Sequence, residues 1–403
     1  MTVLTRPTAT TETRLASRFI LGFLGTCVFM CVYSTQSILP ELSRDFHASA
    51  VATGATIGAT TLAMALMSPI MGLIADAVGR KRVLIATLIL LAIPTLLAGF
   101  SGSLQELVFW RFLQGLIIPG ITVVSMAYVS EEFPKDRISY MLAAYVSGSV
   151  LGGFLGRLVS GIITEHYSWQ TAFYVLGGLN LLGALLCQWM LPQSRNFIPQ
   201  RKLGDALQSI KGHLSNPKLV TANTVGFFTL FSLTGLFTYV NYHLSDAPYN
   251  LGPATLGFLF TVYLIGMVIT PLSGKWIAKL GNSKALILAM CASSLGMLLT
   301  LTPSLYTILL GLVLASSGVF VAQAAATSYV AANATYARSL ASGLYNLCYY
   351  GGGAFSTLLV GFMFTHFGWT GAVLTLMGSQ VVAAGVANFG WRRSGSGLSS
   401  AAA

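Results

Sequence analysis

Two arginines stand inside long apolar stretches of this 403-residue chain. Arg111 lies in the run FWRFLQG, and Arg157 lies in the run FLGRLVS. A cation inside an apolar span is costly, so it suggests a role in binding an anion or in biasing a proton pathway. The alternative is that each side chain reaches outward to the interface or donates to backbone carbonyls. The sequence leaves both alternatives open.

Acidic residues are missing from the interior of the same stretches. All eleven Asp and Glu residues lie in tails, in loops or at the ends of apolar runs. Proton relays in membranes usually use buried Asp, Glu or His, and organic cations also favour a buried carboxylate. We therefore expect a neutral or anionic solute. Proton coupling would have to involve Glu41, Glu106 or the two arginines.

The elements that position these arginines follow from composition. Hydrophobic residues make up 55% of the chain and charged residues 8%, whereas soluble domains carry roughly 25% charged residues. A membrane-spanning helix needs about 20 mostly apolar residues, and the runs here are too long and uniform for barrel strands. The sequence predicts an all-α membrane protein with twelve transmembrane helices. They are expected at 17–38, 51–74, 83–100, 106–129, 140–163, 169–191, 219–243, 254–275, 284–302, 305–329, 340–363 and 370–390.

The basic residues predict the orientation of the chain. Nearly all of the 22 Lys and Arg residues fall on one side of the membrane if both termini are cytoplasmic, as cytoplasmic loops favour Lys and Arg. We expect a multi-pass protein of the inner (plasma) membrane with both termini cytoplasmic. The net charge of +11 then reflects topology, with membrane lipid rather than nucleic acid as the partner.

The chain repeats itself. The stretch SPIMGLIADAVGRKRVLI aligns with TPLSGKWIAKLGNSKALI, and GIITEHYSWQTA aligns with GFMFTHFGWTGA. This predicts two six-helix halves, 1–191 and 219–403, joined by a cytoplasmic linker, 192–218. Apolar residues at helical spacing within the linker indicate an amphipathic helix on the inner membrane surface; a plain linker is the alternative. Two parallel repeats are typical of transporters with a midplane site between the halves.

Over essentially its whole length the chain resembles the major facilitator superfamily. Its loop motif between helices 2 and 3 is filled by GLIADAVGRKR, with Gly72, Asp76, Gly79, Arg80 and Lys81 at the motif positions. The motif R-x-x-Q-G of helix 4 is matched at residues 111–115. On helix 5, the motif of the drug:proton antiporter branch is modified, because Arg157 replaces its proline and Ser160 one of its glycines.

The resemblance implies a gate at the cytoplasmic side. Asp76 is expected to face the N-terminal end of helix 11, where the helix dipole favours a carboxylate. Arg80 is expected to pair with an acid at the inner end of helix 4. Such contacts would close the cytoplasmic side and break when it opens; the alternative is that the cations only set topology. The expected gating residues are Gly72, Asp76, Gly79, Arg80, Lys81, Glu131 and Glu132.

A central cavity is the other expected site. The family's architecture places helices 1, 4, 5, 7, 10 and 11 at the cavity, although the same side chains could instead form interfacial aromatic belts or pack against lipid. The candidates for substrate binding or proton coupling are Arg111, Gln114, Arg157, Tyr33, Gln36, Tyr239, Asn241 and Asn346.

The expected function is secondary active transport by alternating access. Proton-coupled efflux of a small organic solute is the first hypothesis, and import or facilitated passage of an anionic metabolite at Arg157 and Arg111 is the alternative. The spans show no nucleophile with a neighbouring base, no metal cluster and no phosphate loop, so we expect no enzymatic activity and no cofactor. The remaining expected partner is the small-molecule substrate, and we expect a functional monomer.

Overall fold

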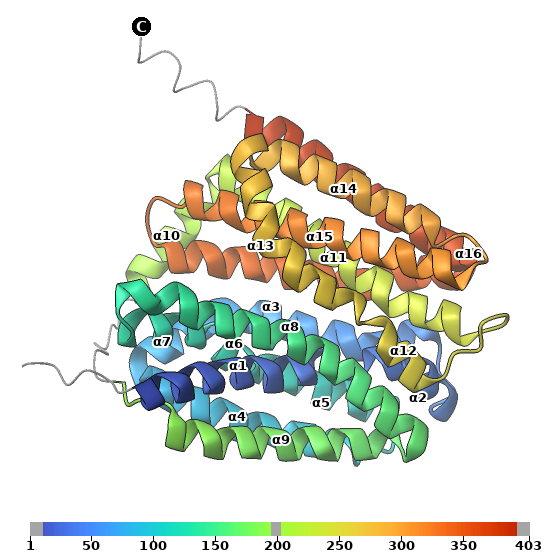
Figure 1. Ribbon diagram of the computed structural model, residues 1–403, viewed down its shortest axis with the longest axis horizontal. Coiled ribbons are helices and arrows are strands. Elements are labelled where there is room, and N and C mark those ends of the chain that lie inside the picture. Colours follow the sequence, from blue (N-terminus) through green and yellow to red (C-terminus); the bar gives the residue numbers. More distant parts are fainter. Residues whose placement is uncertain (1–10, 195–202, 393–403) are drawn as a thin grey trace, which may run out of the picture.

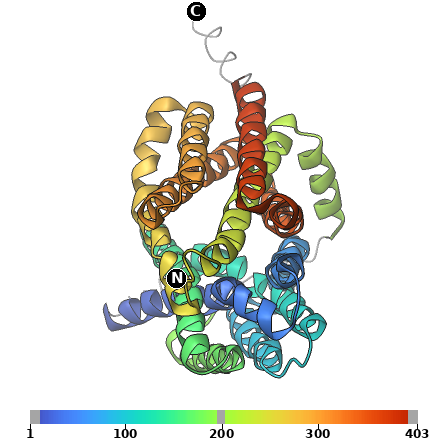
Figure 2. The ribbon, with the colours of Figure 1, turned by 90° about the vertical axis from the view of Figure 1, so that its right-hand side faces the viewer.

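The computed structural model of the protein describes residues 11–194 and 203–392, which are helical apart from turns and short connections. The helices form two bundles that lie side by side, one from each half of the chain (Figure 1). The end-on view in Figure 2 shows the same two bundles. The architecture is therefore all-α, as the sequence predicts.

The first half contains a long helix for each expected span, several of them interrupted. Its elements are α1 (Thr11–Tyr33), η1 (Gln36–Ile38), α2 (Leu39–Asp45), α3 (Ala50–Val78), α4 (Arg80–Ala98), α5 (Leu104–Ile117), α6 (Pro119–Thr122), α7 (Val124–Glu132), α8 (Lys135–His166) and α9 (Trp169–Met190). Serine side chains cap the N-termini of three of these helices, because Ser49, Ser103 and Ser168 accept the backbone N–H of Ala52, Glu106 and Thr171. Such N-caps satisfy donors that the first turn leaves free.

The second half begins with a short helix and continues with longer ones. Its elements are α10 (Leu203–Leu214), α11 (Pro217–Ser245), α12 (Pro253–Leu259), α13 (Val262–Leu280), α14 (Asn282–Leu299), α15 (Leu305–Asn333) and α16 (Arg338–Arg392).

Eleven helical segments within the described residues are long and apolar enough to cross a membrane. The last segment, Leu340–Trp391, has 52 residues, and a continuous helix of that length would run about 78 Å against a hydrocarbon core of about 30 Å. Gly368 breaks it with φ 62° and ψ −161°. The segment therefore comprises two spans, and the expected twelve-helix architecture is confirmed.

The sequence repeat has a counterpart in the backbone. Gly79 between α3 and α4 has φ 106°, and Gly281 between α13 and α14 has φ 78°. Both glycines occupy the same place in their half, at the turn between its second and third spans. Positive φ at this turn disfavours other residues, so the repeated glycine is explained by geometry.

Small residues bring α8 against α1. A Cβ on Gly148 would lie 1.9 Å from the carbonyl oxygen of Gly22, and one on Gly152 would lie 2.3 Å from that of Thr26. The second half repeats the contact, because a Cβ on Gly352 in α16 would lie 1.9 Å from the carbonyl oxygen of Phe227 in α11. Small residues at such a spacing permit close helix packing in membranes.

The helix expected in the linker forms as α10. Its His213 is buried and stacks on Tyr336 of the α15–α16 connection, with ring centroids 4.6 Å apart. This contact fastens α10 to the second half. Residues 195–202 of the linker lie outside the described residues, and the position of α10 on a membrane surface stays a prediction.

The two ends of the molecule are distinguished by their short helices. We call the end that carries α2 and α12 the α12 end, and the opposite end, which carries α7 and α10, the α10 end (Figure 1). At the α12 end the halves make direct hydrogen bonds. Tyr242 of α11 contacts the hydroxyl of Thr53 in α3, and Glu165 of α8 accepts the backbone N–H of Ala254 in α12 at 2.8 Å. The α12 end is therefore closed by contacts between the halves.

Candidate functional site

A cavity of about 270 Å³ lies between the two halves. Its lining is mostly apolar and aromatic, which suits a small organic molecule. The lining residues from the first half are Phe29, Tyr33, Thr122, Met126, Tyr145, Val146, Ser149, Val150, Gly153 and Arg157. Those from the second half are Leu233, Tyr263, Phe320, Asn346, Tyr349 and Tyr350. Among these described lining residues, Arg157 carries the one permanent charge and none is Asp or Glu.

Arg157 is held in an aromatic cage. Its guanidinium carbon lies 4.2 Å from the ring centroid of Tyr33, 4.3 Å from that of Phe260 and 4.7 Å from that of Tyr263. The side chain is 1% exposed. Ring faces attract a cation more strongly when water is excluded, so these rings replace part of the solvation that burial removes.

Hydrogen bonds fix the orientation of the same guanidinium. Nε of Arg157 donates to the side-chain oxygen of Gln36 at 2.7 Å, and Nη1 donates to the carbonyl of Gly153. Nη2 makes no hydrogen bond to any residue that the structure describes. Because the side chain lines the cavity, it can offer free N–H groups to an anion there.

The cavity also contains tyrosine hydroxyl groups. The hydroxyl of Tyr145 is buried and has no hydrogen-bond partner among the described residues. Tyr349 and Tyr350 of α16 meet edge to face, with centroids 5.4 Å apart. Asn346, one helical turn before Tyr350, adds an amide. The lining thus combines flat apolar faces with a few donors, an arrangement typical of sites for small organic molecules.

Arg111 occupies a different environment. It is fully buried, and Nε donates to the carbonyl of Thr56 at 3.2 Å while Nη1 and Nη2 donate to those of Cys31 and Val32 at 2.6 and 2.5 Å. A further bond joins Nη1 to the side chain of Gln114. Arg111 does not line this cavity, and its part in substrate binding or proton coupling stays a prediction. Its donors are taken by backbone carbonyls, the alternative that the sequence had left open.

Besides Arg111, four predicted residues lie outside the cavity lining. One of them, Gln36, accepts the hydrogen bond from Arg157 described above, and the other three make the following contacts. Gln114 joins Arg111 to the hydroxyl of Thr95. The hydroxyl of Tyr239 donates to the carbonyl of Thr357, and the amide of Asn241 donates to the carbonyl of Phe237. These side chains connect neighbouring backbone segments, and they cannot touch a solute in this cavity without a rearrangement. Their part in proton coupling stays a prediction.

At the α10 end, Arg80 forms an ion pair with Glu131, which is one of the two acids that the sequence offers for this pairing. Nη2 donates to one carboxylate oxygen at 2.7 Å, and Nε lies 3.2 and 3.1 Å from the two oxygens. Both residues belong to the first half, at the start of α4 and the end of α7. The pair therefore joins two helices of one half and does not itself bridge the halves.

Lys81 binds to the end of α9. Its Nζ donates to the carbonyls of Gln188 and Leu191 at 3.0 and 2.6 Å, where a cation is favoured by the helix dipole. Gly79 forms the turn before it. The side chains at Gly72 and Asp76 lie outside the described part of the structure, so the expected contact of Asp76 with the start of α16 stays a prediction, as does the role of Glu132.

Sequence reasoning missed two members of the Arg157 cage. Phe260 and Tyr263 lie at the junction of α12 and α13, in the run FLFTVYL, which reads as an ordinary apolar span. Tyr145 in α8 was also missed. The available signal was weak, because an aromatic residue in a span usually packs or faces lipid. Only the position of α12 beside α8 brings these rings to the guanidinium.

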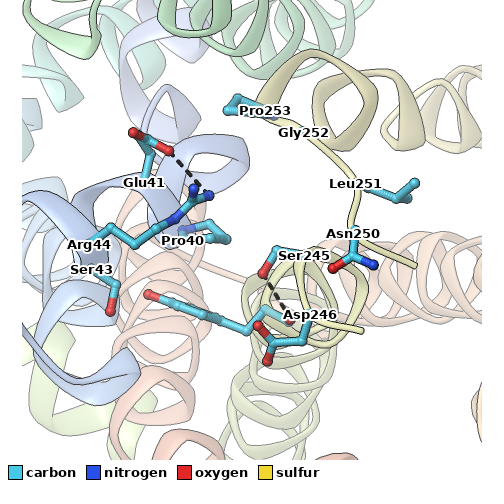
Figure 3. A pocket seen from close by; sticks show the side chains of 11 residues that line it. Pro40, Glu41, Ser43, Arg44, Ser245, Asp246, Asn250, Leu251, Gly252 and Pro253 are labelled. Carbon is cyan, nitrogen blue, oxygen red and sulfur yellow. Dashed lines mark hydrogen bonds and ion pairs between the residues drawn. The ribbon is translucent and has the colours of Figure 1, made fainter. Parts of the chain in front are cut away.

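A second, more polar pocket of about 560 Å³ opens at the α12 end between α2 and the α11–α12 connection. Figure 3 shows Glu41 and Arg44 on one side and Asp246 and Asn250 on the other. Arg44 pairs with Glu41 at 3.2 Å. This pocket shares no lining residue with the central cavity, so we treat the two as separate sites.

Comparisons with known proteins agree with this architecture. The family model described as Major Facilitator Superfamily matches residues 21–252 and 246–396. The inner membrane transport protein YnfM of Escherichia coli is 32% identical over 356 residues, which cover 88% of this chain and 85% of that protein. The multidrug resistance protein MdtG of Salmonella schwarzengrund is 26% identical over 248 residues, covering 60% of this chain and 61% of that protein.

Solved structures share the fold. The nucleoside transporter NupG superimposes with a TM-score of 0.77 over 93% of this chain and 99% of its own. The sequence identity is 14%, so this likeness concerns the fold alone. The matched family and these relatives are transporters and not enzymes.

Proposed function

The chain belongs to the Major Facilitator Superfamily, and from that membership we propose that it exports a small organic anion through the cavity between its halves, in exchange for protons. The observation that carries the proposal is Arg157. Its guanidinium is buried at the cavity, part of it is free of described partners, and the described lining has no carboxylate. A buried cation without an acidic partner is stabilised by a bound anion.

The electrostatics of the lining also disfavour organic cations. A cationic solute would meet the charge of Arg157 at short range in a poorly hydrated cavity, where like charges repel strongly. The aromatic faces of Tyr33, Tyr263 and Phe320 suit an apolar body. The substrate class we propose is therefore a compact monoanion with an aromatic or otherwise flat apolar group.

The direction follows from the membrane potential. Moving one charge across the membrane changes the free energy by about 2.3 kcal/mol per 100 mV, and a negative interior drives anions outward. Export of an anion is thus favoured by the potential that opposes its import. The similarity to MdtG, a multidrug resistance protein, gives weaker support for efflux. Import of an anionic metabolite at Arg157 is the second candidate, favoured by the same guanidinium.

We further propose that the α10 end faces the cytoplasm, with both termini on that side of the inner membrane, and that the single chain is the working unit. The excess of Lys and Arg in the loops of this end supports the orientation. The complete cavity within one chain supports a functional monomer.

The gate proposed at this end uses Asp76 of α3 against the start of α16. The two helices lie close together there, because a Cβ on Gly343 would be 3.7 Å from the Cα of Pro69. Arg80, Lys81 and Glu131 hold the neighbouring helix ends in place. Asp76→Lys is expected to slow transport at least tenfold while membrane insertion stays normal, and Asp76→Glu serves as the charge-preserving control. Normal turnover in Asp76→Lys would remove the gate from the proposal.

Transport assays in proteoliposomes test the function. Three solutes of one shape separate charge from size: benzoate, benzyl alcohol and benzylamine. We expect passage of benzoate that depends on the pH gradient and that Arg157→Leu abolishes. Arg44→Leu removes an exposed cation outside the cavity and is the matched control. Transport of benzylamine in preference to benzoate, or full benzoate transport by Arg157→Leu, would contradict the proposed substrate class.

The same vesicles distinguish export from import. With the α10 end inside and an inside-negative potential, the export proposal expects faster loss of loaded benzoate than uptake at equal concentrations. Accumulation of benzoate against that potential would favour the second candidate. Flux that ignores an imposed pH gradient would exclude exchange with protons.

A further inference from the structure

The cage around Arg157 is built from both halves of the molecule. Arg157 and Tyr33 belong to the first half, whereas Phe260 and Tyr263 belong to the second. Gln36 extends the link, because its oxygen accepts from Nε of Arg157 and its nitrogen donates to the hydroxyl of Thr238 in α11 at 3.0 Å. Arg157, which the proposed function assigns to binding the anionic substrate, is therefore also a point of contact between the halves.

Small residues allow this contact. A Cβ on Gly257 of α12 would lie 2.8 Å from the carbonyl oxygen of Arg157, and a Cβ on Gly161 of α8 would lie 2.3 Å from that of Pro253. The backbones of α8 and α12 thus approach closely at residues 157 and 161, one helical turn apart. Ser37 also donates to the carbonyl of Arg157 at 2.7 Å. The position of Arg157 consequently depends on closure of the α12 end.

We propose that Gln36 and Phe260 position Arg157 so that closure of the α12 end depends on the charge in the cavity. In the empty cavity the bare guanidinium attracts rings from both halves and holds the end closed. A bound anion neutralises the guanidinium and weakens its attraction to Phe260 and Tyr263, because a ring face is attracted by net positive charge. The α12 end then opens more readily. This inference rests on the proposed function only in taking an organic anion as the substrate.

The arrangement explains how a carrier can avoid opening empty at this end. Opening separates Phe260 and Tyr263 from Arg157 and breaks the bond from Gln36 to Thr238. Without an anion, opening would remove the contacts of the guanidinium with the rings of the second half, which is unfavourable. With an anion bound, the cation keeps a partner throughout the movement. Substrate charge and conformational change are coupled through one side chain.

Distance measurements between two spin labels test the proposal. The labels replace Arg44 and Asp246, which face each other across the pocket of the α12 end (Figure 3). Cys291 and Cys348 are replaced by serine so that they are not labelled; Cys291 is exposed and Cys348 partly buried, whereas the other three cysteines are buried. The ratio of long to short distances then reports opening of the α12 end in the full-length protein.

Phe260→Leu removes one ring of the cage, and Phe237→Leu is its matched control. Phe237 is equally buried and packs on Phe260 and Tyr263 with centroid distances of 5.4 and 4.7 Å, but its ring does not lie over Arg157. Without ligand, we expect Phe260→Leu to raise the open-to-closed ratio at least fivefold and Phe237→Leu to change it less than twofold. Phe260→Tyr keeps a ring and should restore the closed state.

Ligand and transport measurements complete the test. In the unmodified cage, benzoate should raise the same ratio and benzyl alcohol should not. Gln36→Leu should raise the KM for benzoate several-fold with a smaller change in kcat, and Gln36→Asn should recover part of the affinity. Equal distance ratios in Phe260→Leu and Phe237→Leu would overturn the proposal. If Phe260→Leu opens the empty protein while benzoate neither binds nor shifts the ratio, the proposed substrate class is contradicted. The proposed role of the Arg157 cage in closing the α12 end is then still supported.

Discussion

Arg80 holds the carboxylate of Glu131 through two nitrogens, and both residues belong to the same half of the molecule. The pair fixes the start of α4 against the end of α7. It can therefore persist while the two halves move relative to each other. The contact between the halves that we propose for the α10 end is that of Asp76 with the start of α16.

The Arg80–Glu131 pair should contribute measurably to stability. Arg80→Gln leaves a partly buried carboxylate without its main partner, and a hydrogen bond to a charged group is worth about 1.5–3 kcal/mol. We expect a lower Tm in detergent and partial recovery in the exchanged double variant Arg80→Glu/Glu131→Arg. Arg44→Gln breaks an exposed pair and should cost less than about 1 kcal/mol. Equal changes in Tm for the two single variants would contradict the assignment.

Lys81 should stabilise α9 in a way that Arg82 does not. Its ammonium binds two carbonyls at the end of that helix, a contact worth up to about 2 kcal/mol when partly buried. Lys81→Met is therefore expected to lower the Tm clearly. Arg82→Met removes the same charge from an exposed position and should stay within about 0.5 kcal/mol. If the two variants unfold at the same temperature, the cations act only through topology.

Arg111 should be needed for folding and dispensable for substrate recognition. Arg111→Met removes four hydrogen bonds from a charged, fully buried donor, each worth about 1.5–3 kcal/mol, so little monodisperse protein should be recovered by size exclusion. Arg111→Lys can satisfy only part of the set and should fold with a lower Tm. Its KM for benzoate should equal that of the unchanged protein. A stable Arg111→Lys variant with an altered KM would place Arg111 in substrate binding after all.

Gly152 should tolerate no side chain. A methyl group there would lie 2.3 Å from the carbonyl oxygen of Thr26, and forcing extra atoms into a packed contact costs about 1–3 kcal/mol or more. Gly152→Ala is expected to lower the Tm and the yield of folded protein. Gly178 in α9 has open space around its Cα, so Gly178→Ala should be neutral or stabilising by about 0.4–1 kcal/mol. Similar losses of Tm in both variants would mean that the effect comes from helix propensity and not from the close packing of α1 against α8.

Features that depend on local composition could be predicted from the sequence. Span length, loop charge and the repeated glycines each follow from a few neighbouring residues. The turn at Gly79 and its counterpart at Gly281 are an example, because both φ values are positive as a tight turn requires. The sequence also predicted that Arg80 pairs with Glu131 or Glu132, and the structure shows the pair with Glu131.

Features that depend on contacts between distant helices could not be predicted. Arg111 and Arg157 look alike in sequence, each a lone cation in an apolar span. They differ because α5 packs where the carbonyls of α1 and α3 are within reach, while α8 faces the second half. The same limit hid Phe260, whose role depends on α12 lying against α8. No local pattern encodes that proximity.

The partners of Arg111 also bear on the biosynthesis of the protein. Its backbone acceptors at Cys31, Val32 and Thr56 all precede it in the chain, and Gln114 lies one turn later in the same helix. When α5 enters the membrane, every group that accepts a hydrogen bond from Arg111 has already been made, so the first half can bury Arg111 before the second half exists. Arg157 differs, because Gln36 and Tyr33 come before it and Phe260 and Tyr263 come after it. Its cage is completed only when the second half has been translated, which makes the formation of this cage a marker for the moment when the two halves first meet.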